Sequence, residues 1–234
     1  MKTVAIMQPY WLPYIGYWQL INAVDVFVLY DTVTYIKQGW INRNRFIING
    51  NPQWVTLPIS HASSYSLIKD IKLVSNNKRK VSKTLFQSYA RAPYISQVSS
   101  TLYACLEYSS DYLVDYIYFT LNKILTLLNI KKKIIYSSDI EHDITLNGED
   151  KILDICHQLD AQCYINMSGG YKLYKSSSFK KSGIKLLFLE KKLFNYKQFN
   201  HTQAFIDNLS ILDILMNNSI EDTIGFLSHY SLYE

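Results

Sequence analysis

Five short apolar runs, most of them separated by segments with helical spacing, constrain what this chain can fold into. Continuous apolar runs of this length are typical of strands that are buried on both faces of a parallel sheet. Between the first two runs, residues 14–24 place apolar side chains at helical spacing. Strand, helix and strand in this order predict a βαβ unit with parallel strands. The runs occupy residues 3–8, 25–31, 133–138, 163–168 and 184–190.

Other segments depart from this alternation. An Asn-Gly-Asn sequence at 49–51 separates two strand-like stretches and predicts a β-hairpin. Apolar-periodic stretches at 78–129 predict helices, and amphipathic patterns predict two more at 209–217 and 219–230. We therefore predict an α/β fold with a doubly wound, mainly parallel, Rossmann-like sheet and a β-hairpin excursion. Residues 1–234 are expected to form a single domain, with a helical insertion at about 78–129.

Composition and charge exclude several classes of protein. Of the 234 residues, 48% are hydrophobic and 18% are charged, as in a globular protein. The net charge of +5 is not gathered in a stripe, so we expect no nucleic-acid partner. Three widely spaced cysteines suggest neither a disulfide framework nor a zinc site. The apolar stretch before Pro9 is too short for a signal-peptide core, and no run of about 18 apolar residues occurs, so we expect a cytoplasmic protein without a transmembrane segment.

An unusually rigid and aromatic loop, QPYWLPYIGY (8–17), follows the first predicted strand. In doubly wound sheets, ligands bind beyond the carboxyl ends of the strands, and the first strand–helix loop is a favoured place. Gly16 would allow close backbone approach, and the following helix would offer free N–H groups to an anion. The alternative is that the prolines stiffen a crossover while the aromatic side chains pack in the core.

The same region resembles a known catalytic opening. A strand, a Pro-rich loop, Tyr14-Ile15-Gly16-Tyr17, a helix and Ala-x-Asp are similar to the HxGH opening of nucleotidylyltransferases and of pantothenate-synthetase-like ligases. Both histidines of that motif are tyrosines here, and tyrosine is not a cation at neutral pH. The resemblance therefore implies a nucleotidylyltransferase-like layout, whereas adenylylation chemistry lacks its transition-state clamp.

A second resemblance covers nearly the whole chain. Its segments are QPYWLPYIGYWQLI (8–21), YDTVTYIKQGWINRNRF (30–46), TLPI (56–59), YINMSGGYKLY (164–174) and LSILDILM (209–216). On these segments the chain resembles the WbqC-like family, which is encoded among bacterial surface-polysaccharide (O-antigen) genes. Where that family tends to have glutamine after the Asp-x-Val stretch, this chain has Thr34.

This second resemblance implies a role in building amino-sugar-containing glycans such as the O-antigen of lipopolysaccharide. The implied function is transfer of an acyl or aminoacyl group to the amine of a nucleotide-linked sugar. An activated acyl or aminoacyl donor would then be a second substrate, and no cofactor is specified. One alternative is a non-catalytic sugar-nucleotide-binding partner of a glycosyltransferase. Another is an ATP-dependent, adenylate-forming amide ligase.

The densest polar segment is IKQGWINRN (36–44). Arg43 and its neighbours suit a phosphate or carboxylate, because arginine binds either group with two parallel hydrogen bonds. Trp40 could stack on a base or sugar. In a strand, Asn42 and Asn44 would share one face while Arg43 and Arg45 share the other, so we expect one arginine to be solvated. The alternative is a polar hairpin rim with Trp40 in a core.

Candidate catalytic residues are Asp31, Lys37 and His201. Asp31 ends the second predicted strand, where a carboxylate can accept a proton or hold a sugar hydroxyl; the alternative is a turn cap. His201, or His61, could act as a general base near neutral pH, and a surface role is the alternative. No acidic cluster suggests a metal ion.

These residues predict one sugar-nucleotide pocket. Strands one and four should be neighbours where the strand order reverses, so their loops should form two facing walls. The first wall would comprise Gln8, Tyr10, Tyr14, Gly16 and Tyr17. The second would comprise Asn166, Gly169 and Gly170, and the rim would comprise Trp40, Asn42, Arg43 and Asn44.

Overall fold

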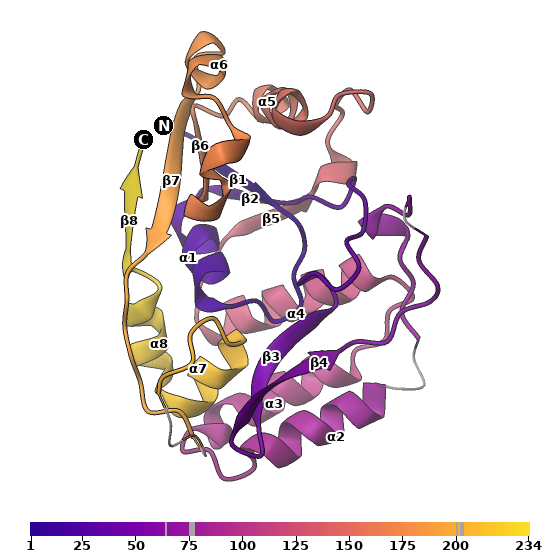
Figure 1. Cartoon of the computed structure of the whole chain (residues 1–234), viewed down its shortest axis with the longest axis vertical. Helices are drawn as coiled ribbons and strands as arrows, with labels where there is room; N and C mark the ends of the chain where they lie inside the picture. Colours follow the sequence, from indigo (N-terminus) through magenta and orange to yellow (C-terminus); the bar gives the residue numbers. More distant parts are fainter. Residues whose placement is uncertain (64, 75–77, 200, 202–203) are drawn as a thin grey trace.

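The computed structural model describes residues 1–63, 65–74, 78–199, 201 and 204–234, and its centre is a six-stranded sheet (Figure 1). The strand order is β5-β2-β1-β6-β7-β8; five strands run parallel and β8 is antiparallel to β7. All five predicted strands are present, which confirms the α/β class and the mainly parallel sheet. The strands are β1 (Thr3–Met7), β2 (Val26–Leu29), β5 (Lys133–Tyr136), β6 (Cys163–Met167), β7 (Lys185–Lys191) and β8 (Tyr230–Tyr233).

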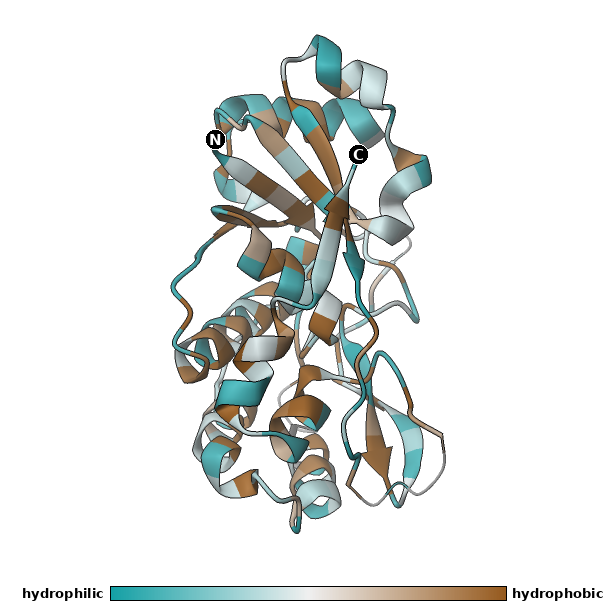
Figure 2. Ribbon diagram, turned by 90° about the vertical axis from the view of Figure 1, so that its left-hand side faces the viewer, coloured by the Kyte–Doolittle hydropathy of each residue, from teal (hydrophilic) through white to brown (hydrophobic). Residues whose placement is uncertain are grey.

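Alternate residues of the central strands face opposite layers of helices. Val4 packs in one buried cluster with residues of α5 (Gly148–Gln158) and α6 (Ser176–Lys181). Ala5 packs in a second cluster with residues of α1 (Ile15–Ala23). The two-residue period of a strand produces this alternation, and it explains why the strand sequences are apolar throughout. Figure 2 shows brown segments through the middle of this sheet, as expected for strands covered on both faces.

The predicted hairpin forms a separate two-stranded sheet. Its strands are β3 (Arg43–Ile48) and β4 (Asn51–Thr56), paired antiparallel. Asn49 and Gly50 form the turn with φ values of 50° and 78°. Both are in the left-handed region that an Asn-Gly hairpin turn requires, so the local sequence signal is sufficient here.

The segment predicted to be helical is helical. Figure 1 shows α2 and α3 beside the hairpin in the lower part of the molecule, with the six-stranded sheet above. The second buried cluster, which begins on the sheet, continues through α1 and the hairpin into these helices. The helices are α2 (Lys78–Tyr89), α3 (Ile95–Glu107) and α4 (Leu113–Leu127).

The C-terminal prediction is partly wrong. Helix α7 (Ile211–Asn217) matches the first amphipathic pattern, but the second helix, α8 (Ile220–Phe226), ends early and Tyr230–Tyr233 forms strand β8. Two contacts explain the early end. The buried Gln19 amide donates to the carbonyl oxygens of Phe226 and His229 at 2.8 and 3.1 Å. Strand β8 then pairs with the edge of β7, and this tertiary pairing overrides the helical periodicity.

Candidate functional site

The strand order reverses between β1 and β6, which confirms that the first and fourth predicted strands are neighbours. Their ladder joins only Thr3 to Cys163 and Val4 to Tyr164. In contrast, the ladder between β1 and β2 continues to Met7. Strands β1 and β6 therefore stop pairing toward their carboxyl ends. The loops that follow them, Gln8–Pro13 and the 3-10 helix η4 (Ser168–Leu173), leave the sheet at this edge, where open α/β sheets bind ligands.

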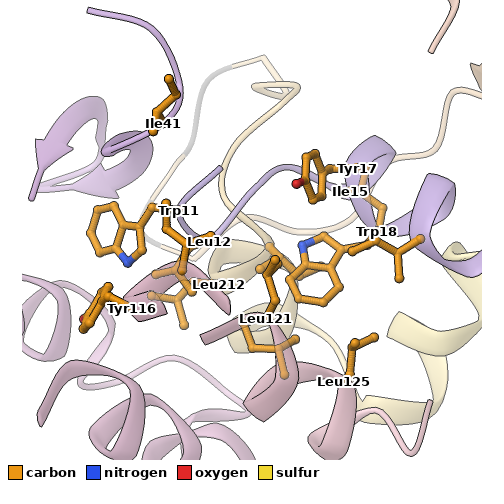
Figure 3. Close-up of a cluster of buried hydrophobic side chains, with 14 of the residues drawn as sticks. Trp11, Leu12, Ile15, Tyr17, Trp18, Ile41, Tyr116, Leu121, Leu125 and Leu212 are labelled. Carbon is orange, nitrogen blue, oxygen red and sulfur yellow. The ribbon is translucent and has the colours of Figure 1, made fainter. Parts of the chain in front are cut away.

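The lower half of the first loop belongs to the core. Trp11 and Leu12 are buried, and Figure 3 shows them pointing toward Tyr116 of α4 and Leu212 of α7. Leu12 has a φ of 45°, which is costly for a leucine. Its carbonyl accepts hydrogen bonds from Asn44 and from Ser210, and these bonds hold the backbone in place. For these two residues the packing alternative is correct.

The upper half of the loop presents polar groups. The Gln8 side-chain amide and the Tyr10 hydroxyl have no hydrogen-bond partner among the described residues, and both side chains are partly exposed. Burial raises the pKa of Tyr10, so its hydroxyl stays a neutral hydrogen-bond donor. Tyr17 is fully buried and donates to the Gln8 carbonyl at 3.0 Å, which makes it a support beneath the loop.

Gly16 has a steric role at the start of α1. A Cβ atom there would lie 2.6 Å from Tyr14 Cε2 and 2.9 Å from Met167 Cε, so glycine lets the loops after β1 and β6 touch. The Tyr14 ring also lies 6.4 Å from the Trp40 ring. Burial, with smaller effects of Tyr10 and Asp207, raises the pKa of Tyr14 to about 12. Tyr14 is therefore uncharged near neutral pH.

The two glycines of the loop after β6 differ in the space beside their Cα atoms. Asn166 is buried, and its Oδ1 accepts from the Met167 backbone N–H at 2.7 Å. A Cβ on Gly170 would lie 2.9 Å from Asn166 Nδ2, so Gly170 makes room for that amide. A Cβ on Gly169 would meet nothing within 4 Å, which leaves Gly169 open to a ligand.

The predicted alternation in β3 is confirmed. Asn42 and Asn44 are both buried, whereas Arg43 and Arg45 are partly exposed. Asn42 accepts from the Tyr35 hydroxyl and donates to the Leu57 carbonyl, both at 2.8 Å, so its side-chain oxygen and nitrogen both have partners inside the protein.

The face of β3 that carries the arginines forms an aromatic and cationic surface. The Arg43 guanidinium lies 4.2 Å from the centre of the Trp54 ring and donates to the carbonyls of Gln38 and Gly39. The Trp54 ring lies 4.9 Å from that of Trp40. Arg43 thus braces the loop that carries the exposed Lys37 and keeps part of its guanidinium for other contacts.

Asp31, Lys37 and His201 do not form a common catalytic group. The Asp31 carboxylate is buried and accepts from the hydroxyls of Ser137 and Ser138, both at 2.7 Å, and from the Ser138 N–H at 2.9 Å. It thereby ties the end of β2 to η3 (Ser137–Asp139). Lys37 is exposed in the loop braced by Arg43.

His201 lies at the hairpin tip, where its two ring nitrogens face the carbonyls of Gly50 and Ala204 at 2.8 and 3.0 Å. These two acceptors raise the pKa of His201. A raised pKa favours the imidazolium, which cannot accept a proton. His61, the other candidate base, is exposed.

Two cavities beside the end of β2 were not predicted. One, of about 330 Å³, is lined by Asp31, Asp115 and Tyr136 among others. The other, of about 460 Å³, lies between the residues after β2 and the start of α5, and Lys69 and Lys151 line it. Thr34 also lines this second cavity. Lysines without a motif give no sequence signal, because only the tertiary fold brings residues 30–34, 67–69 and 144–151 together.

The fold and this edge of the sheet define an α/β protein with polar loops at the carboxyl ends of parallel strands. The chain belongs to the WbqC-like protein family, whose profile matches residues 8–224. It is also similar to an uncharacterized protein of Mycobacterium tuberculosis (Rv1507c), with 27% identity over 225 residues, covering 94% of this chain and 96% of that protein. No solved structure gives a significant match. Within the described residues, no helix has both the length and the apolar character needed to cross a bilayer.

Proposed function

We propose that the chain binds a nucleotide-linked amino sugar at the β1–β6 edge and transfers an acyl or aminoacyl group to its amine during surface-glycan biosynthesis. The observation that carries the proposal is the reversal of strand order between β1 and β6, where the two strands stop pairing. A Rossmann-like sheet binds a nucleotide at this position. Gln8, Tyr10 and Gly169 offer groups there that the protein does not use itself.

The aromatic side chains beside this edge support a sugar or base as the ligand. Tyr14, Trp40 and Trp54 follow one another at ring distances of 6.4 and 4.9 Å. Rings of this kind contact the apolar faces of sugars and bases, while Arg43 can pair with a phosphate. The proposed binding residues are therefore Gln8 and Tyr10 on one wall, Gly169 on the other, and this aromatic row at the rim. Asn42, Asn44 and Tyr17 serve as their internal supports.

A second candidate function is a sugar-nucleotide-binding protein without catalysis. It is favoured by one observation, namely that Asp31 and His201 are each held by internal partners and lie in different places. An aminoacyl transfer from a strongly activated donor needs only a weak base, so both candidates are compatible with this geometry. The two differ in whether the bound sugar is altered.

The test combines calorimetry with mass spectrometry. A uridine-diphosphate-linked sugar with a free amine should bind saturably, and incubation with acyl- or aminoacyl-activated donors should add the acyl mass to that amine. Gln8→Ala should weaken binding by about tenfold or less, the effect of one hydrogen bond, with an unchanged melting temperature. Binding without a mass change would select the non-catalytic function. Absence of binding by the parent would refute both candidate functions.

A further inference from the structure

The cavity between β2 and α5 is lined by groups that attract anions. It measures about 460 Å³, and Lys69 and Lys151 line it together with Thr34 and the start of α5. The segment around Lys69 is fixed there by backbone bonds. The Lys69 N–H donates to the Asp31 carbonyl at 3.0 Å, and the Ile68 N–H donates to the Val33 carbonyl at 2.9 Å. The lysine therefore sits on a braced segment that is paired with the end of β2.

Lys151 is the unusual member of this group. Its side chain is 93% buried, since its exposed fraction is 7%, yet it makes no hydrogen bond or ion pair with any described residue. Its nitrogen is not among the fully buried polar atoms that lack a partner, so the buried stem carries the charge out to the cavity surface. Hydrogen bonds from Thr145 lower the pKa of the nearby Asp143, and the charge of Lys151 adds only a minor effect. Asp143 and Lys151 form no ion pair. The ammonium thus lines a cavity with its hydrogen-bonding capacity unused.

The start of α5 adds further donors to the same cavity. Asn147 is the N-cap residue, but its side chain makes no capping bond and donates instead to the Thr145 carbonyl. The first-turn N–H groups of this 11-residue helix are thus left without a side-chain acceptor. Glu149 and Asp150 are both in that turn, but neither lines the cavity, and the Glu149 carboxylate accepts from the Lys175 N–H at 2.5 Å.

We propose that this cavity is a phosphate-binding site, in which Lys151 and Lys69 pair with the phosphate oxygens and the start of α5 supplies N–H donors. Two cations and an uncapped helix start match a group with more than one negative charge better than a carboxylate. The site is centred on β2, one strand away from the β1–β6 edge, and shares no residue with Gln8, Tyr10 or Gly169. It does not depend on the proposed transferase function, because a simple phosphate anion is sufficient to occupy it.

The experiment is a titration with inorganic pyrophosphate, followed by calorimetry and by ³¹P NMR. Pyrophosphate should bind saturably to the parent and about tenfold more weakly to Lys151→Met, while Lys151→Arg should stay within about threefold of the parent. Lys180→Met is the matched control, because Lys180 is exposed and lines a different cavity near the amino end of β7. Competition with uridine diphosphate and with unlabelled pyrophosphate identifies the source of the phosphate: displacement by uridine diphosphate at a lower concentration than pyrophosphate assigns it to a nucleotide, and displacement at an equal or higher concentration assigns a free anion.

The melting temperature provides a second test, because a lysine with only a structural role would not give the following pattern. Without ligand, Lys151→Met should melt at about the same temperature as the parent or higher, because methionine keeps the buried apolar stem and removes a charge that no described side chain pairs with. Pyrophosphate should raise the melting temperature of the parent more than that of Lys151→Met. The proposal is overturned if Lys151→Met binds pyrophosphate like the parent, or if Lys180→Met weakens binding equally.

Discussion

The Asn44 side-chain amide donates to the Leu12 carbonyl oxygen at 2.7 Å, so a buried residue of the hairpin holds the strained turn of the first loop. The same amide reaches the Trp11 carbonyl at 3.2 Å. Both carbonyls lie in a region without water access, where an acceptor that loses its donor costs free energy. The polar residue Asn44 is thus needed in β3 because it supports the loop that follows β1.

Asn44→Ala should lower the free energy of unfolding by about 2–3 kcal/mol, because the buried Trp11 carbonyl loses its side-chain donor and the Leu12 carbonyl keeps only that of Ser210. Urea denaturation measures this change. Asn51→Ala is the control, since Asn51 is exposed at the start of β4 and bonds only locally to the Asn49 carbonyl. Equal stability of the two variants would mean that Asn44 does not hold the loop.

Gly16→Ala should destabilise the protein, although alanine is normally the better helix residue by about 1 kcal/mol. The added Cβ would lie 2.6 Å from the Tyr14 ring, so this ring must shift, and with it the contact that it makes with Trp40. Tryptophan fluorescence and thermal melting should both change. In Gly225→Ala, on α8, the new Cβ meets nothing within 4 Å, so this control should gain stability. A gain in both variants would contradict the packing of Tyr14 on Gly16.

The fold was predictable where the signal is local. Apolar runs gave the five parallel strands, and Asn49-Gly50 gave the hairpin turn. Strand β8 was missed because its pairing partner, the edge of β7, is distant in sequence. The periodicity of residues 219–230 could not show that Gln19, on another helix, would bond to carbonyls at the end of α8.

The site was less predictable, because a polar side chain gives no sign of whether it faces a ligand or the protein. Asn42 and Gln8 are both amides, yet Asn42 is satisfied internally whereas Gln8 has no described partner. Asp213 illustrates the same limit: it is buried within α7 and accepts from the hydroxyls of Tyr89 and Tyr196 at 2.8 and 2.7 Å. Such networks join residues from elements far apart in sequence, and only the tertiary structure reveals them.

The pH dependence of stability should include a contribution from His201. Its folded pKa is raised above 6.5, because the imidazolium donates to two carbonyls. By linkage, this stabilisation is fully present below pH 6.5 and is lost as the pH rises through the folded pKa. His201→Gln should therefore lower the melting temperature more at about pH 5.5 than at about pH 8.5, which lie below and above the ordinary histidine pKa. His61→Gln is the control, and a deficit of His201→Gln that is equal at both pH values would refute this assignment.

ATP–pyrophosphate exchange should not occur with this protein alone. The pKa of Tyr14 is raised to about 12 by burial, and burial also raises the pKa of Tyr17 well above its usual value. Neither side chain can supply the positive charge that a transferred nucleotidyl group requires. Radiolabelled pyrophosphate should stay out of ATP in the presence of any candidate acid. Substrate-dependent exchange would instead favour the adenylate-forming ligase alternative.

Arg43→Ala should affect both stability and ligand binding. The loop that contains Gln38 and Gly39 loses a bridging guanidinium, and the Trp54 ring loses its cation, so the free energy of unfolding should fall by about 1–2 kcal/mol. If Arg43 also pairs with the phosphates of a sugar nucleotide, calorimetry should show binding weaker by about ten- to a hundredfold, or 1.5–3 kcal/mol. Arg43→Lys keeps the charge but not the planar fork, so it should recover part of the affinity and little of the stability. Arg91→Ala, at an exposed position, should change neither quantity. Unchanged affinity together with lowered stability in Arg43→Ala would restrict this arginine to bracing the loop.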